Sequence, residues 1–156
     1  MDKNYIVNGI LGGILPVIAI SGAGATTIKT TNAVTAKIDG AIVAVAAATL
    51  AAIPATITVP ANSTSSIGVY VNQAGTASYV QGTTVLNTSL VNVAVGANPA
   101  FTALNNTINL PQEVPGKALI GWVIVKTTTT VFTAGTTLLD AATYTLTYLD
   151  KPALSL

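Results

Sequence analysis

The 156-residue sequence contains no cysteine, no histidine and no arginine. Without cysteine, the chain forms no disulfide and has no thiolate that could bind a metal or attack a substrate. Without histidine, it lacks the side chain that serves most often as a general base and as a transition-metal ligand. We therefore expect a protein that is not an enzyme and that holds no metal ion or cofactor.

Charge is also scarce. Charged residues make up 7% of the chain, six lysines against five acids, for a formal net charge of +1, whereas a soluble domain usually carries about 25%. The lysines are scattered singly, and a nucleic-acid surface requires clustered positive charge. The sequence thus argues against a nucleic-acid partner. The few carboxylates follow no spacing that selects a catalytic pair; they are Asp2, Asp39, Glu113, Asp140 and Asp150.

Hydrophobic residues make up 51% of the chain, and Thr, Ala, Val and Asn are abundant. This composition favours strands. A monomer with strand edges stays soluble by placing lysine, proline or bulges on those edges, and this chain has few charges for that purpose. We expect a homo-oligomer, a trimer or a polymer, in which copies of the chain cover one another's apolar surface.

The N-terminal stretch 5–25 is apolar and is interrupted by Gly9, Gly12, Gly13 and Pro16. These interruptions argue against a signal peptide and against a membrane span, which needs about 20 consecutive apolar residues. We interpret residues 1–28 as an apolar arm and residues 29–156 as a single β-rich domain. An apolar arm is costly in water, so we expect it to contact a partner. The expected partner-contacting residues are Ile6, Ile10, Leu11, Ile14 and Leu15.

Turn signals predict an all-β domain, a β-sandwich or barrel-like fold built from hairpins. Asp39-Gly40 joins 33–38 to 41–45, and Asn72 to Gly75 joins 67–71 to 76–80. In the second hairpin we expect Tyr70 and Tyr79 to form a cross-strand pair. Residues 62–66 are expected to form a bend. The run 41–53 fits either a buried strand or a short helix, and we favour a strand to about Val45 with a less regular continuation.

The C-terminal quarter contains the strongest strand pattern. Residues 118–126 are apolar on both faces, which predicts a central strand. Alternation places Ala118, Ile120, Trp122 and Ile124 on one face of it. Residues 143–149 alternate threonine with Tyr144, Leu146 and Tyr148, which is typical of a half-buried strand. We expect Trp122, Tyr144 and Tyr148 to contact the core or another subunit.

Three segments carry a likeness to a known family: 116–125 (GKALIGWVIV), 132–142 (FTAGTTLLDAA) and 145–150 (TLTYLD). Together with 37–40 (KIDG) and the hairpin 69–82, they resemble head-fibre or head-decoration proteins of tailed bacteriophages. The resemblance covers about two-thirds of the chain, from roughly residue 30. It implies a β-rich virion structural protein, often trimeric, that attaches to the capsid and so to the major capsid protein. It supplies no catalytic residue.

Two other functions remain open at this point. The chain could be a secreted, cell-surface filament or pilus-like subunit, in which the N-terminal arm adds as a strand to the next copy. It could also be a carbohydrate-binding β-sandwich that uses Trp122 and the tyrosines. Cleavage after Ala23 or Ala25 would favour secretion, and glycan binding lost in Trp122→Ala would favour the sugar-binding function.

Overall fold

The computed structural model describes residues 8–12, 15–87 and 108–152. Strands are the only regular elements with defined bounds in these ranges, which confirms the predicted all-β class. The strands are β1 (Gly9–Leu11), β2 (Ile18–Ile20), β3 (Ile28–Thr30), β4 (Val34–Ile38), β5 (Ala41–Val45), β6 (Thr58–Val59), β7 (Ser63–Asn72), β8 (Ala77–Gln81), β9 (Val85–Leu86), β10 (Lys117–Thr127), β11 (Phe132–Thr133) and β12 (Tyr144–Asp150).

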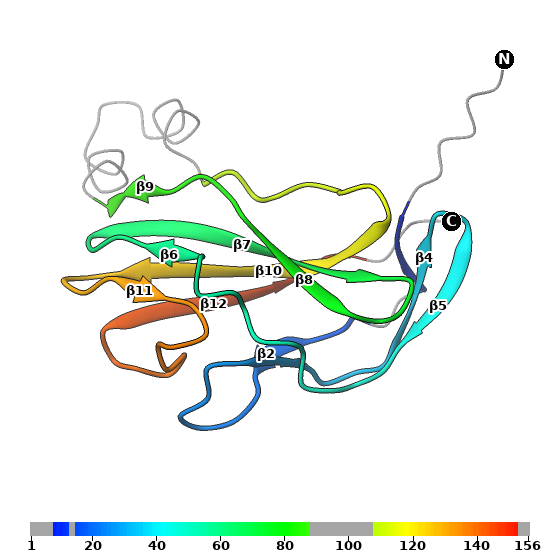
Figure 1. Cartoon of the computed structure of the whole chain (residues 1–156), viewed down its shortest axis with the longest axis horizontal. Coiled ribbons are helices and arrows are strands. Elements are labelled where there is room, and N and C mark those ends of the chain that lie inside the picture. Colours follow the sequence, from blue (N-terminus) through cyan, green and yellow to red (C-terminus); the bar gives the residue numbers. More distant parts are fainter. Residues whose placement is uncertain (1–7, 13–14, 88–107, 153–156) are drawn as a thin grey trace, which may run out of the picture.

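The main sheet has five antiparallel strands. Its order is β12-β10-β7-β8, and β9 adds to the start of β7. The long strands β7 and β10 lie at its centre because their side chains are apolar or small on both faces and are almost all buried. The prediction of a central strand at 118–126 is confirmed. Figure 1 shows β7, β10 and β12 side by side along the long axis of the molecule.

Three smaller sheets face this main sheet: β1-β4-β5, β2-β3 and β6-β11. Side chains from all four sheets meet in one buried cluster, so the fold is a sandwich with its core between the layers. The hairpin of β4 and β5 forms one end of the molecule (Figure 1). The largest fully buried side chains of this cluster include Ile10, Ile28, Ile38, Ile53, Ile67, Ile120 and Phe132.

The turn between β4 and β5 has the predicted form. Asp39 has φ 49° and Gly40 has φ 85°, and positive φ at both central residues defines a type I′ turn. Such a turn matches the twist of the flanking strands, so it joins Ile38 directly to Ala41. The hairpin that the Asp-Gly pair predicts is confirmed.

The hairpin of β7 and β8 is present, but the expected pairing of Tyr70 with Tyr79 is wrong. Tyr70 lies opposite Ser78, and Tyr79 lies opposite Val69. Because neighbouring residues of a strand point to opposite faces, the two tyrosines lie on different sides of the sheet. The reason is the turn: Asn72 extends β7 and its backbone N–H donates to the Thr76 carbonyl at 3.1 Å, which leaves a three-residue loop.

The polar stretch 63–66, which we expected to bend, instead begins β7. Its four side chains are 0 to 3% exposed. Buried hydroxyls require hydrogen-bond partners, and several find them here: Thr64 Oγ1 lies 2.6 Å from Asn87 Oδ1, and Ser66 Oγ donates to a carbonyl at 2.7 Å. Tertiary partners thus allow a turn-like composition to form a strand.

The N-terminal stretch contributes two strands to the layer that faces the main sheet. β1 pairs with β4, and β2 pairs with β3. Ile10 on β1 and Ile18 on β2 belong to the same buried cluster as the central strands. Where the structure describes residues 1–28, they pack on the rest of the chain. The division of the chain at residue 28 into arm and domain stays a prediction for the remaining N-terminal residues.

Candidate functional site

Trp122 lies directly after a β-bulge in β10. Leu119 lies opposite Tyr70 on β7, but the next paired residue is Gly121, which lies opposite Val69. The extra residue places Trp122 on the same face as Leu119 and Tyr70, and these three form a second buried cluster outside the main core. Trp122 is 9% exposed, so it packs within its own chain.

The bulge overturns the faces that we expected for this strand. Alternation predicted Trp122 on one face with Ala118 and Ile120, yet those two residues belong to the main core on the other side of the sheet. One inserted residue moves every later side chain to the opposite face. An apolar run that is buried on both sides contains no hydrophobic pattern that would reveal the insertion.

A segment without regular structure, residues 109–114, crosses this second cluster and is called the strap here. Three side chains of the main sheet donate hydrogen bonds to main-chain carbonyls of the strap. Each bond satisfies a buried donor and holds the strap against the sheet. The bonds run from Ser66 Oγ to the Asn109 carbonyl (2.7 Å), from Trp122 Nε1 to the Pro111 carbonyl (2.9 Å) and from the Tyr70 hydroxyl to the Gln112 carbonyl.

Two glycines allow the strap to lie this close. A Cβ on Gly68 would lie 2.8 Å from Cε2 of Tyr70 and 2.9 Å from Cβ of Pro111. A Cβ on Gly82 would lie 2.3 Å from the Asn109 carbonyl oxygen. Real Cβ atoms are not found at such distances, so a residue with any side chain at either position would push the strap away from the sheet.

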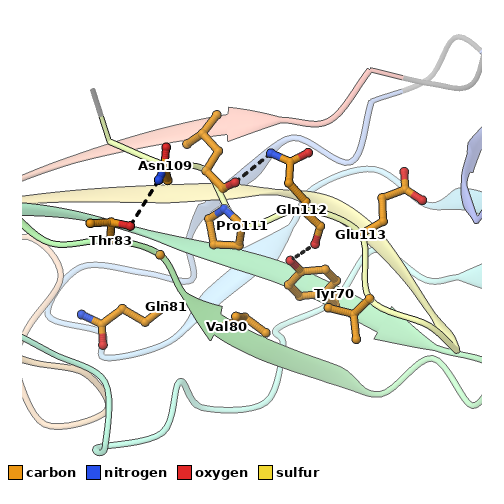
Figure 2. A pocket seen from close by; sticks show the side chains of 11 residues that line it. Tyr70, Val80, Gln81, Thr83, Asn109, Pro111, Gln112 and Glu113 are labelled. Carbon is orange, nitrogen blue, oxygen red and sulfur yellow. Dashed lines mark hydrogen bonds between the residues drawn. The ribbon is translucent and has the colours of Figure 1, made fainter. Parts of the chain in front are cut away.

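The strap and the end of β8 border an open groove of about 550 Å³. Figure 2 shows Tyr70 and Val80 on one side of it and Asn109, Pro111 and Gln112 on the other. Polar contacts within the groove are internal, such as Gln112 Nε2 to the Leu110 carbonyl at 2.8 Å. The lining residues run from Val80 to Thr83 and from Asn109 to Val114, with Tyr70.

The groove has little reactive chemistry. Of the described residues that line it, Glu113 alone is charged. Burial raises the pKa of the Tyr70 hydroxyl above its ordinary value, and the negative charge of Glu113 raises it further. At neutral pH this hydroxyl is therefore a hydrogen-bond donor to the strap. The groove thus offers apolar walls, amides and one carboxylate.

A smaller hollow of about 270 Å³ adjoins the other end of the strap, with Asn8, Asp39 and Glu113 in its lining. Asn8 and Asp39 hold each other: the Asn8 amide donates to Asp39 Oδ1 at 3.1 Å, and the Asp39 backbone N–H donates to Asn8 Oδ1 at 2.7 Å. These bonds fix the hairpin turn against β1. In the part of the chain that the structure describes, no three acidic side chains gather into a group that could hold a metal ion.

Tyr144 and Tyr148 lie on the inner face of β12, half-buried against the main core. The ring of Tyr144 meets Phe132 edge to face, with centroids 5.5 Å apart at 77°, and its hydroxyl donates to the Val131 carbonyl at 3.0 Å. Burial, and then the charge of Asp140, raises the pKa of Tyr148. Both tyrosines thus pack within the chain.

The residues expected in the N-terminal arm lie in different surroundings. Ile10 is fully buried in the chain's own core, Leu11 is half-buried, and Leu15 is 39% exposed. Ile6 and Ile14 lie outside the described residues. Leu15 is therefore the one described member of this set with a largely accessible side chain.

Three strand edges of five residues or more have no partner among the described strands. They are the outer edges of β12 and β8 in the main sheet, and the outer edge of β5 in the sheet β1-β4-β5. Neither β5 nor β8 contains a charged residue or a proline, and β12 contains only Asp150, at its last position. Asp150 Oδ1 accepts a hydrogen bond from the Ile18 backbone N–H at 2.9 Å. We call these the free edges.

The exposure of β5 was not anticipated from the sequence. We favoured a buried strand from residue 41 to about Val45, yet Ile42 is 73% exposed, and Ala41 and Ala44 are exposed as well. The local sequence gives no signal of this exposure, because the strand AIVAV is apolar throughout and its cover depends on which segment lies beside it.

Comparison with known proteins adds no relative. No family model matches the chain, and no curated protein or solved structure is similar to it. Within residues 8–12, 15–87 and 108–152, the structure contains no helix with the length and apolar character needed to cross a bilayer.

Proposed function

We propose that this chain is a non-enzymatic structural subunit of a virus particle, a capsid-decoration or head-fibre protein that associates with copies of itself. The observation that carries the proposal is the set of free edges. Each presents backbone N–H and C=O groups at the rim of a sheet, and such rims pair readily with another strand.

The free edges lack the usual protection against pairing. Proteins that remain monomeric place lysine, proline or a bulge on an outer strand, and β5 and β8 have none of these. The whole chain has only eleven charged side chains, so little repulsion opposes the close packing of many copies. A protein with these properties is suited to remain in an assembly.

The virion assignment is supported by the resemblance of 116–125, 132–142 and 145–150 to phage head-fibre and head-decoration proteins. The first segment covers most of β10, the second contains β11 and the turns after it, and the third covers most of β12. The first and third segments therefore belong to the main sheet. In this role the other partner is the major capsid protein, and the strap groove, with a single carboxylate in its lining, is a surface suited to contact with it.

The two other functions receive less support. A sugar-binding site needs an aromatic ring open to solvent, and Trp122 is covered by the strap. A filament built by donated strands needs an unpaired N-terminal segment, and residues 9–11 already pair with β4 of the same chain.

Two measurements test the proposal. In sedimentation velocity over a hundredfold dilution, we expect a defined oligomer that persists to low concentration and changes little with salt, because few charges take part. In purified particles of the virus that encodes the chain, mass spectrometry should find it in many copies per capsid. A monomer at all concentrations, or absence from purified particles, would overturn the proposal.

A further inference from the structure

The outer edge of β5 has no partner among the described strands. We propose that β5 of one chain adds antiparallel to β5 of a second copy about a two-fold axis through Val43, which joins two β1-β4-β5 sheets into one six-stranded sheet. The inference rests on the self-association in the proposed function and assigns it a surface and a register.

The first observation is exposure. Ile42 is the most exposed large hydrophobic side chain among the described residues, at 73%. Ala41 and Ala44 beside it are exposed, and the strand AIVAV contains no polar side chain. If a second copy covered the Ile42 side chain, apolar surface would be removed from water, and this transfer is favourable.

The second observation is the direction of the backbone groups. Because two residues form the turn, Ile38 and Ala41 close the hairpin as a hydrogen-bonded pair. Hydrogen-bonded and non-bonded pairs alternate along an antiparallel ladder, so Val43 also bonds inward to Ala36. The N–H and C=O groups of Ile42 and Ala44 then point outward from the edge, and no other described strand meets them.

These outward groups select one register. When Ile42 of one copy lies opposite Ala44 of the other, both residues of each strand bond, and two symmetric pairs form within the bounds of β5. Moving the register by one pair in either direction requires bonds from Gly40, which is in the turn, or from Ala46, whose carbonyl accepts a bond from Thr30 Oγ1 at 3.2 Å. The two Val43 residues, one from each copy, then lie opposite each other at the two-fold axis as a non-hydrogen-bonded pair.

Side-chain size agrees with this register. On the outer face, the large Ile42 of one copy lies beside the small Ala44 of the other, twice, by symmetry. Side chains directly opposite in an antiparallel pair are close enough to touch. A large residue beside a small one fills the space without a clash, whereas the neighbouring registers place two isoleucines or two alanines together.

Charge is compatible as well. Lys37 lies opposite Ile42 on β4 and is the nearest lysine in this sheet. In the joined sheet, β5 of both copies separates Lys37 of one copy from Lys37 of the other. Three strand spacings of about 4.8 Å put the two backbones about 14 Å apart, which exceeds the screening length of about 8 Å at physiological salt. Repulsion between them is therefore small.

Crosslinking tests the register directly, because the chain has no cysteine of its own. In the proposed pairing, the two Val43 Cα atoms are about 4.5 Å apart, within the range of about 4.4–6.8 Å that a disulfide spans. The two Ile42 Cα atoms, and likewise the two Ala44 Cα atoms, are diagonal neighbours about 9 Å apart. Val43→Cys should therefore give mostly covalent dimer on mild oxidation, and Ile42→Cys and Ala44→Cys several-fold less.

The outcomes separate this inference from the proposed function. If the wild type self-associates but Val43→Cys gives no more covalent dimer than the two control variants, the β5 pairing is wrong and the proposed function stands. If Ile42→Cys or Ala44→Cys gives the larger yield, the register is wrong. If the wild type sediments as a monomer, both fail.

A second pair of variants tests the surface without a new covalent bond. Ile42→Lys places a charge on the free edge and should weaken dimerisation at least about tenfold, and the side chain is exposed enough for the fold to tolerate it. Leu138→Lys is the matched control, since Leu138 is 46% exposed on a loop that is not part of the sheet β1-β4-β5. Equal dissociation constants for the two variants would contradict the inference.

Discussion

Trp122 and Pro111 are joined by a hydrogen bond of 2.9 Å from the indole Nε1 to the proline carbonyl oxygen. The bond ties the centre of the main sheet to the strap that covers it. Lys151 lies over the same indole, with Nζ 5.7 Å from the ring centroid, in the range of a cation–π contact. The one tryptophan of the chain thus connects β10, the strap and the residue that follows β12.

Trp122→Phe should destabilise the fold by about 2 kcal/mol, because it leaves the buried Pro111 carbonyl without a donor and the ring site partly empty. Urea denaturation followed by circular dichroism measures the loss. Tyr144→Phe is the control: it removes the bond to Val131 at a more accessible site and should cost less than about 1 kcal/mol. Similar losses in the two variants would show that the strap is not held by the indole.

Gly68→Ala should destabilise the fold by about 1–3 kcal/mol, because the new methyl group would overlap Tyr70 and Pro111 and lift the strap. Gly22→Ala is the matched control, since a Cβ there has open space and no positive φ is involved. We expect the control to lie within about 0.5 kcal/mol of the wild type. Thermal unfolding of both variants measures the difference, and a Gly68→Ala midpoint equal to that of Gly22→Ala would refute the close approach.

Val17→Asn should stabilise the fold. Val17 has φ 51°, a left-handed conformation that disfavours a β-branched residue, while its side chain is 41% exposed. Asparagine tolerates this conformation, so the change should raise the free energy of unfolding by about 1 kcal/mol. Val131→Asn, at a residue 50% exposed without positive φ, controls for the loss of apolar surface. Urea titrations that rank Val17→Asn below Val131→Asn would contradict the expected strain.

Alkaline pH should destabilise the protein through its tyrosines. Burial raises the pKa of Tyr79 well above its ordinary value, and it also raises the pKa values of Tyr70 and Tyr148. A raised pKa in the folded state means that the neutral form is favoured by folding. The stability is therefore fully present below the unfolded pKa of about 10 and is lost as pH rises through the folded values.

Tyr79→Phe tests this linkage. The variant also loses the hydrogen bond from the hydroxyl to the Ala51 carbonyl, which shifts stability at every pH. The slope of stability against pH above about 10 should nevertheless become shallower, since one linked proton is gone. Urea midpoints across the alkaline range measure the slope, and an unchanged slope would assign the pH dependence to other groups.

Local chemistry made parts of the fold predictable. Asp39-Gly40 specifies a type I′ turn by itself, because few residues other than these adopt positive φ without cost. The apolar run 118–126 predicts a central strand because a strand with one face in water would expose one of its two hydrophobic faces. The alternation in 143–149 likewise places Tyr144 and Tyr148 inward, because residues two apart in a strand lie on the same face and the apolar face packs on the core.

The sequence by itself determined the all-β class, because short-range patterns indicate strands. It also determined the absence of histidine and cysteine chemistry and the low number of charged side chains, because these follow from composition alone. Only the tertiary structure decided the bulge after Leu119, the cover that the strap places over Trp122, and the exposure of Ile42 on a free edge. Each of these depends on which distant segment lies alongside a strand. An apolar residue has the same local preference whether a neighbouring strand covers it or leaves it open.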